Sequence, residues 1–257
     1  MLRSILPLLA LCAAAGCGGG GNGPSIPAIP QEPIPSDASP GGIWEGSSSL
    51  GFTVVALVTE SGQFHLMRGD GVQFVGTAST SEKRLSANFV GYAPFPQAFG
   101  DGSTTGTGTL TGTVKERKSI DADSSFRTSK GAASDSTIAL SYEKLYERDS
   151  SLGTIAGNYL DTERNSVMSV NNDGTLFSQD PGNHCVLNGA VSVIEPEFNL
   201  YRVSYEFSNC RGRWSKLNGT DAEGLATLDD TRSPEALVIS VVVEDVGYAF
   251  AGVLPRE

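Results

Sequence analysis

From residue 43 onward, short runs in which apolar and polar residues alternate follow one another along the chain. A period of two places apolar side chains on one face of a β-strand, whereas a helix needs a period near 3.6. Gly, Asn, Asp and Ser interrupt the runs at the spacing of hairpin turns. The sequence therefore predicts an all-β fold. Only residues 142–148 favour a helix, and a strand is also possible there. The clearest runs are 52–58, 72–75, 201–207 and 237–243.

Landmarks of the first half of the chain recur in the second half in the same order. Three pairs keep a nearly constant offset, and two later pairs, 110–113 with 217–220 and 138–141 with 237–240, are closer together. We interpret this as an internal repeat with a shorter second copy: two tandem antiparallel β modules, 43–150 and 151–257, each a small barrel or a sandwich. The three pairs of constant offset are Gly42-Ile43-Trp44 with Gly157-Asn158-Tyr159, Ser61-Gly62 with Asp173-Gly174, and Val75-Gly76 with Asn188-Gly189.

The first module opens on Gly42-Ile43-Trp44, which resembles the first-strand motif of lipocalins. The resemblance implies a calycin-like barrel. A core tryptophan beside a turn glycine is the alternative explanation of the same three residues.

The N-terminus has the features of an export signal. Arg3 precedes an apolar run over residues 5–15, which is too short to span a bilayer. Ala14-Ala15-Gly16-Cys17 resembles the lipobox of bacterial lipoproteins, which implies removal of a signal peptide of residues 1–16 and a lipid, with palmitate-type chains, on Cys17. Gly18 stands where inner-membrane lipoproteins often have Asp, so the resemblance implies a lipid anchor in the outer membrane of a Gram-negative bacterium. An ordinary secretory signal, cut at Ala13-Ala14-Ala15, is the alternative.

Residues 17–42 form a Gly- and Pro-rich segment between the leader and the first module. Pro24, Pro27, Pro30 and Pro33 recur at the period of a polyproline II helix. We expect a disordered N-terminal tether that holds the folded part away from the membrane, and we favour this spacer over a Pro-x-x-Pro ligand for a partner's groove.

Two of the four cysteines remain for the folded part, because Cys12 leaves with the leader and Cys17 takes lipid. Exported proteins fold in oxidising compartments, so Cys185 and Cys210 are predicted to form a disulfide. The two histidines, His65 and His184, with these cysteines do not make up the three or four close ligands of a zinc site. We expect no metal and no cofactor.

The charge balance argues against nucleic acid as a partner. The formal net charge is −11 and no block of basic residues occurs, whereas binding to phosphate backbones needs a basic surface. The expected partners are the membrane, through the N-terminal lipid, and an envelope protein or polymer.

The sequence has no recognisable catalytic site. Ser141 and Lys144 match Ser-x-x-Lys but lack the companion motifs of serine acyl-enzymes. The paired carboxylates are expected to be solvated rim charges, and the aspartates of the Ser-rich stretch are expected to lie in a solvated loop. The paired carboxylates are Asp229-Asp230, Glu195 with Glu197, and Glu244-Asp245, and the aspartates are Asp121, Asp123 and Asp135.

Two loops are candidates for recognition. Arg68-Gly69-Asp70 spells an adhesion tripeptide, but Gly-Asp-Gly is also ordinary turn chemistry. The segment 209–216 is the densest basic and aromatic cluster on an acidic chain, and Arg211, Arg213 and Trp214 are its candidate ligand-binding residues.

We therefore expect a lipid-anchored envelope protein that is not an enzyme and acts as a binding or interaction module. A structural component of outer-membrane assembly is the alternative. A hydrolase that uses paired carboxylates is a third hypothesis.

Overall fold

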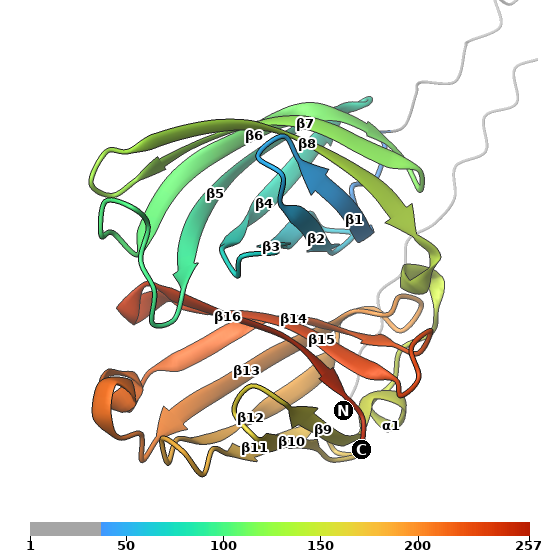
Figure 1. Cartoon of the computed structure of the whole chain (residues 1–257). Coiled ribbons are helices and arrows are strands. Elements are labelled where there is room, and N and C mark those ends of the chain that lie inside the picture. The colour runs from blue at the N-terminus through green and yellow to red at the C-terminus, as the bar shows by residue number, and fades with distance from the viewer. Residues whose placement is uncertain (1–36) are drawn as a thin grey trace, which may run out of the picture. The chain divides into compact units, whose positions relative to one another are not determined.

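The structure, a computed structural model, describes residues 37–257, and almost all of its regular elements are antiparallel β-strands (Figure 1). The predicted all-β fold is confirmed. Sixteen strands follow the chain as two successive meanders, and all described residues belong to one compact unit. The leader, Cys12, Cys17 and the proline-rich segment up to residue 36 lie outside the described residues.

Strands β1–β8 close into a barrel, which we call the first barrel. Each strand pairs with its neighbours in sequence, and β1 pairs with β8 from Ile43 opposite Glu143 to Ser48 opposite Ile138. Closure leaves no free sheet edge and decides for a barrel over a sandwich in this module. The strands are β1 (Gly42–Ser48), β2 (Thr53–Val58), β3 (Gln63–Arg68), β4 (Gln73–Ser81), β5 (Arg84–Pro94), β6 (Thr105–Lys115), β7 (Ser119–Thr128) and β8 (Ala133–Glu143).

Alternation decides which side chains fill the first barrel. Along β7 the residues Ile120, Ala122 and Phe126 are buried, while Asp121, Asp123, Ser125 and Arg127 between and beside them are exposed. On β1, Trp44 is fully buried and its Nε1 donates a hydrogen bond to the carbonyl oxygen of Pro40 at 3.0 Å. This bond satisfies the indole N–H inside an apolar core.

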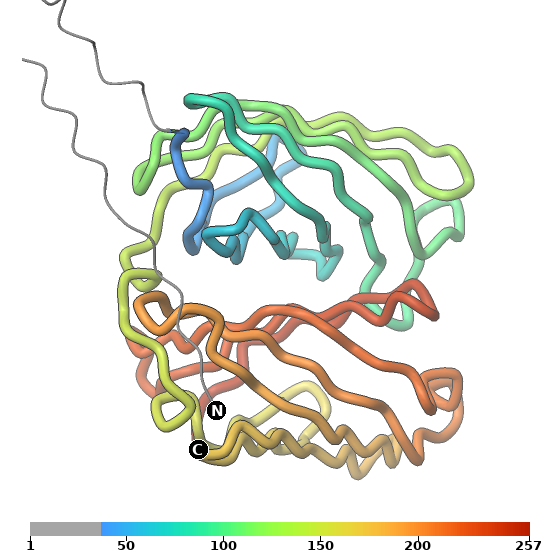
Figure 2. The backbone as a smooth tube through the Cα atoms, turned by 180° about the vertical axis from the view of Figure 1, so that it is seen from behind, coloured from blue at the N-terminus to red at the C-terminus, as the bar shows by residue number. Residues whose placement is uncertain are grey.

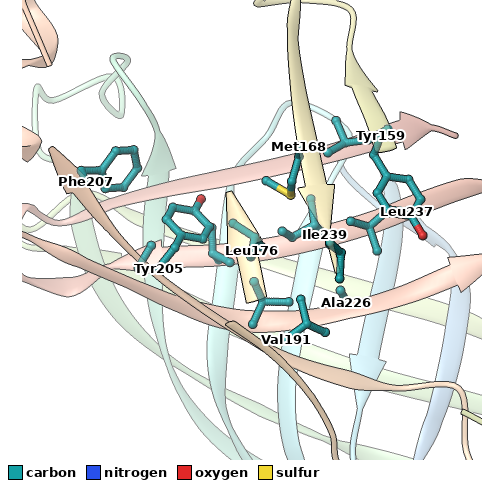
Figure 3. Close-up of a cluster of buried hydrophobic side chains, with 14 of the residues drawn as sticks. Tyr159, Met168, Leu176, Val191, Tyr205, Phe207, Ala226, Leu237 and Ile239 are labelled. Atoms are coloured by element: carbon teal, nitrogen blue, oxygen red, sulfur yellow. The ribbon is translucent and has the colours of Figure 1, made fainter. Parts of the chain in front are cut away.

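Strands β9–β16 form the second meander, which we call the second barrel. Its first and last strands meet at a single bridge between Tyr159 and Arg256. Figure 3 shows buried side chains of its core, including Met168, Tyr205 and Ile239. The strands are β9 (Gly157–Asp161), β10 (Ser166–Val170), β11 (Thr175–Gln179), β12 (Val186–Val193), β13 (Tyr201–Ser208), β14 (Asp221–Asp229), β15 (Ala236–Val243) and β16 (Tyr248–Pro255).

The helices are short and lie between strands. For residues 142–148 the sequence favours a helix but also allows a strand. In the structure the first two of these residues end β8, and the next four form a single 3₁₀ turn. Among residues 37–257 no helix has the length and apolar character needed to cross a lipid bilayer. The helices are η1 (Lys144–Glu147), α1 (Leu152–Ile155), η2 (Gly212–Leu217) and η3 (Glu244–Val246).

The three landmark pairs of constant offset lie in corresponding places of the two barrels. Gly62 and Gly174 both end the turn before the third strand with positive φ, +86° and +85°. Each carbonyl then accepts a hydrogen bond from the fourth strand, from Ala78 N and Val191 N. An L-residue with a side chain rarely adopts this φ, which explains why both positions are glycine.

The two later landmark pairs are wrong. Residues 110–113 lie inside β6, whereas 217–220 lie in the turn before β14. The counterpart of Gly112 is Gly224, because a Cβ on either would clash with the carbonyl of the following strand, at Asp121 or at Ser240. Residues 138–141 lie in an eighth strand and 237–240 in a seventh, so the shrinking offset has no structural basis.

The two barrels are joined by backbone and side-chain contacts, and they lie one above the other in Figure 2. The start of β16 pairs in parallel with the end of β5, through Tyr248 opposite Ala93. An apolar cluster shared by the barrels lies between them, and we call it the seam. Its buried members are Ile43, Leu57, Met67, Tyr146, Leu200 and Leu225.

Candidate ligand cavities

The interior of the first barrel is hollow at one end. A cavity of about 190 Å³, which we call the mouth cavity, opens between the β1–β2, β5–β6 and β7–β8 connections. A smaller cavity of about 40 Å³ lies deeper and shares Leu66 and Ile138 with it as a common wall. The space exists because several inward positions carry small side chains, such as Ala56, Ala87 and Ala122.

One wall of the mouth cavity is aromatic. Phe74 on β4, Phe126 on β7 and Phe99 in the β5–β6 loop all line it. The ring centroid of Phe126 lies 5.4 Å from that of Phe74 and 5.3 Å from that of Phe99. The first contact is edge-to-face and the second is tilted, and both geometries are favourable for aromatic pairs.

A second wall carries serine hydroxyls from three neighbouring strands. Ser48 ends β1, Ser136 lies on β8 next to it, and Ser124 lies on β7 directly opposite Ser136. Ser48 and Ser124 are 9% and 6% exposed, so they belong to the barrel interior. Among residues 37–257 no group hydrogen-bonds Ser48 Oγ, which is fully enclosed.

The rim of the mouth cavity carries an internally neutralised arginine. Arg68 Nε and Nη2 donate to the Asp70 carboxylate at 2.8 and 2.6 Å, and the guanidinium lies 4.2 Å above the Phe52 ring. Burial raises the pKa of Asp70, but the hydrogen bonds and charge of Arg68 outweigh it, so the net shift is downward. The adhesion tripeptide is therefore a turn whose two charges bind each other.

A loop clamp lies beside the same rim. Asp101 accepts hydrogen bonds from Ser103 and from the Thr128 hydroxyl, and these lower its pKa to about 2. Leu50, also on the rim, is 46% exposed, which is unusual for so large an apolar side chain here. The rim thus combines fixed polar loops with one exposed apolar residue.

The second barrel contains a smaller cavity of about 70 Å³, lined by Met168, Phe207 and Ile239 among others. At its mouth the Arg164 guanidinium lies 5.7 Å from the Trp214 ring and pairs with Asp161 at 2.5 Å. Burial raises the pKa of Tyr205, whose side chain also lines the cavity.

Of the three candidate ligand-binding residues, Trp214 lines this cavity. Arg211 and Arg213 are exposed and are not among its lining residues. Trp214 packs against Phe95 of the first barrel, with ring centroids 4.4 Å apart. The predicted loop therefore contributes a wall residue rather than a basic patch.

The predicted disulfide between Cys185 and Cys210 is confirmed. It connects the start of β12 to the segment before η2, and Cys185 lines the cavity of the second barrel. The cross-link thus ties the Trp214 turn to the barrel wall.

Among residues 37–257, one histidine–serine hydrogen bond occurs, and it lies between the barrels. His65 Nδ1 is 3.1 Å from Ser240 Oγ, and this hydroxyl donates to Gln73 Oε1 at 2.5 Å. Ser240 and Gln73 are completely buried, and His65 nearly so. Because the hydroxyl proton is directed at Gln73 and no solvent reaches it, this group can join the barrels but cannot attack a substrate.

The Ser-x-x-Lys candidate is divided between two elements. Ser141 is exposed on β8, and Lys144 begins η1. The hydrogen bonds of the described residues do not join their side chains.

The carboxylate pairs have structural partners or lie near the surface. Asp229 is buried, so the expectation of a solvated rim charge is wrong for it, and it accepts hydrogen bonds from Thr231 and Arg232 at the β14–β15 turn. Asp230 pairs with Arg148. Glu244 and Asp245 form η3. Burial raises the pKa of Glu195, and the negative charges of Glu60 and Glu197 raise it further.

The three aspartates of the Ser-rich stretch lie in strands, not in a loop. Asp121 and Asp123 are exposed on β7, and Asp135 is exposed on β8. The expected loop is wrong because the outward positions of a barrel strand accept polar residues as readily as a loop does. Within the part of the chain that the structure describes, no three His, Cys, Asp or Glu side chains gather as a metal site would require. His184 is exposed next to Cys185.

The serines of the mouth cavity were missed in the sequence. Ser124 belongs to the same set of alternate residues as Ile120, Ala122 and Phe126, which point into the barrel. The alternation along residues 119–128 therefore predicts that Ser124 points inward too. Ser48 lies four residues after Trp44 on β1, so it is predicted to lie on the same, inward side of that strand.

The sequence matches no family model and no curated protein. The cavities therefore carry the functional argument.

Proposed function

We propose that this protein is a non-enzymatic binding module that holds a small apolar molecule inside its first barrel, at the bacterial outer membrane. The observation that carries the proposal is the mouth cavity of about 190 Å³ with its three phenylalanines. An apolar cavity of about 150 Å³ is large enough to bind benzene in another protein. The proposed site accordingly has room for one aromatic ring and a short substituent.

The surroundings of the cavity favour binding over chemistry. The charged side chain that lines it, Arg68, is occupied by Asp70. The histidine–serine contact lies outside the barrel interior and away from solvent. Among residues 37–257 the lining offers no free acid or base, and a largely apolar space of this kind is suited to holding a ligand.

A cavity-filling variant tests the binding site. In Ser124→Leu the larger side chain points into the mouth cavity, and we expect it to weaken binding of toluene at least about tenfold by excluding the ligand. Calorimetric titration of toluene into the full chain carrying Cys17→Ser, which avoids detergent, gives the affinity.

Ser125→Leu is the matched control, because Ser125 is exposed on the outer side of the same strand. It should bind toluene like the parent chain. Absence of toluene binding to the parent, or equal binding by Ser124→Leu, would overturn the proposed site.

The membrane anchor is a separate part of the proposal and rests on the lipobox-like Ala14-Ala15-Gly16-Cys17. Several acyl chains hold a protein at a bilayer far longer than one does. In a Gram-negative host, the parent chain should incorporate a palmitate analogue and sediment with outer membrane, and Cys17→Ala should do neither. Equal, unlabelled and soluble behaviour of both would instead favour a free exported protein.

A further inference from the structure

We infer that the mouth cavity selects an uncharged ring compound that carries a hydroxyl group, and that Ser48 recognises this hydroxyl. The inference rests on the proposed function and specifies its ligand class. Four features of the cavity carry it: an enclosed serine hydroxyl, two further serines beside it, the aromatic wall, and the neutralised rim.

Ser48 Oγ is the first feature. The side chain is 9% exposed, lines the mouth cavity, and has no hydrogen-bond partner among residues 37–257. The inward direction follows from parity, since Trp44 on the same strand points into the barrel core. In the rotamer present the Oγ atom itself is closed off from the cavity, so the hydroxyl bonds a ligand only after rotation about χ1 toward the space that the residue lines. A buried hydroxyl without a partner is costly, so a ligand that supplies a partner after this rotation gains affinity.

The neighbouring serines extend the same wall. Ser48 stands opposite Ile138 on β8, and Ser136 is the next inward residue of that strand. Ser136 stands opposite Ser124 on β7. Hydroxyls donate and accept, so this wall can bind a hydroxyl in either orientation.

The aromatic wall selects a ring. Phe74, Phe99 and Phe126 come from two strands and a loop, so they present ring faces and edges to the same space. Aromatic pairs prefer offset or edge-to-face contacts at centroid distances of about 4.5 to 7 Å. A flat ring placed between this wall and the serines meets both requirements.

The charges of the lining exclude an ionic ligand. Among the described residues of the lining, Arg68 alone is charged, and both arms of its contact go to Asp70. An anion would have to displace Asp70, and a cation would meet no carboxylate in the cavity. An ion would therefore lose its hydration without a partner.

Phenol and toluene test this inference because they differ by one hydroxyl in place of a methyl group. Their affinities are measured by calorimetric titration with the full chain carrying Cys17→Ser, and with the same chain plus Ser48→Ala. We expect Ser48→Ala to lower the affinity for phenol, relative to that for toluene, by about fivefold. This is the factor in affinity to which one ordinary hydrogen bond corresponds. Toluene affinity should stay the same or improve.

Two further variants complete the design. Ser47→Ala removes an exposed serine next to Ser48 on the same strand and should leave the ratio of phenol to toluene affinity unchanged. Ser124→Ala removes a second hydroxyl of the wall and should lower the phenol affinity in the same direction as Ser48→Ala. It also provides an independent result if Ser48→Ala fails to fold.

The outcomes separate this inference from the proposed function. If toluene and phenol both bind and neither serine variant changes their ratio, hydroxyl recognition is overturned and the binding site stands. If neither compound binds the parent chain, the proposed function fails together with the inference.

Discussion

The hydroxyls of Ser240 and Thr227 are both buried, but only the first has hydrogen-bond partners. Ser240 contacts Gln73 and His65, whereas Thr227 Oγ1 has no partner among residues 37–257. The backbone around Thr227 is an ordinary β14 strand, so this hydroxyl adds only the cost of lost hydration. A buried hydroxyl group is thus stabilising or destabilising according to what faces it.

Thr227→Val keeps the branched shape of the side chain and removes this hydroxyl. We expect the free energy of unfolding to rise by about 1 kcal/mol, because no bond is lost and the hydration cost disappears. Urea denaturation measures the change. Thr137→Val, at an exposed position of β8, should change stability by less than about 0.5 kcal/mol. A loss of stability in Thr227→Val would mean that the hydroxyl has a bonded partner.

His65 makes stability depend on pH. Burial, and then the charge of Arg202, lowers its pKa from 6.5 to about 4. The unfolded chain takes up a proton below about pH 6.5 while the folded protein resists protonation down to about pH 4, so stability falls as the pH drops through this window. The loss attributable to His65 is roughly 3 kcal/mol.

Replacement of the histidine isolates this contribution. In His65→Gln the decrease in unfolding free energy between pH 7 and pH 4 should be smaller than in the parent by that amount. His184→Gln, which changes the exposed histidine, is the matched control. Identical pH profiles for the parent and His65→Gln would contradict the assignment.

At the scale of strands, alternation made much of the fold predictable, since a residue's parity decides which side of a barrel wall it occupies. Repeated turn chemistry also located Gly62 and Gly174. The counterpart of Gly112 was not predictable, because that glycine is required by the approach of a neighbouring strand. Such approaches are set by barrel closure, which no local pattern encodes.

The candidate site was less predictable than the strands. Trp214 was predicted as a ligand-binding residue because it lies in the densest basic and aromatic cluster of the chain, and it lines the cavity of the second barrel. The mouth cavity depends on six strands and on loops that are distant in sequence, and on small side chains that leave space only once the barrel closes.

The disulfide should stabilise the second barrel. The bond between Cys185 and Cys210 encloses a loop with a sequence separation of 25. Loss of the bond should reduce the free energy of unfolding by about 3.5 kcal/mol, since the unfolded chain gains conformational freedom. Urea denaturation of Cys185→Ala with Cys210→Ala measures this change, and the parent under reducing conditions should agree with it. Unchanged stability would show that the loop is already constrained in the unfolded chain.

At the scale of the whole molecule, the seam should make the two barrels unfold together. The chain has two tryptophans, Trp44 in the first barrel and Trp214 in the second. Single-tryptophan variants therefore report each barrel by fluorescence. We expect both signals to change at one denaturant concentration. The reason is that Leu57 of the first barrel and Leu225 of the second barrel are both buried in the seam, so unfolding of either barrel exposes apolar surface of the other.

Leu57→Ala with Leu225→Ala should separate the two transitions, since each truncation of a buried leucine costs about 2 to 5 kcal/mol. Leu110→Ala, in the first barrel's own core, should lower stability while the two signals stay coincident. Separate transitions in the parent would show that the seam does not couple the barrels.

The order of the strands also determines the order in which the molecule can be completed during synthesis. All pairings that close the first barrel lie between Gly42 and Glu143, so they can form before the second half has been translated. The last strand, Tyr248–Pro255, joins β15 to β5 and leads directly to the bridge with Tyr159. An interrupted chain would therefore present a finished first barrel with its seam side chains exposed, a surface that invites aggregation or chaperone binding until Leu200 and Leu225 of the second barrel cover it.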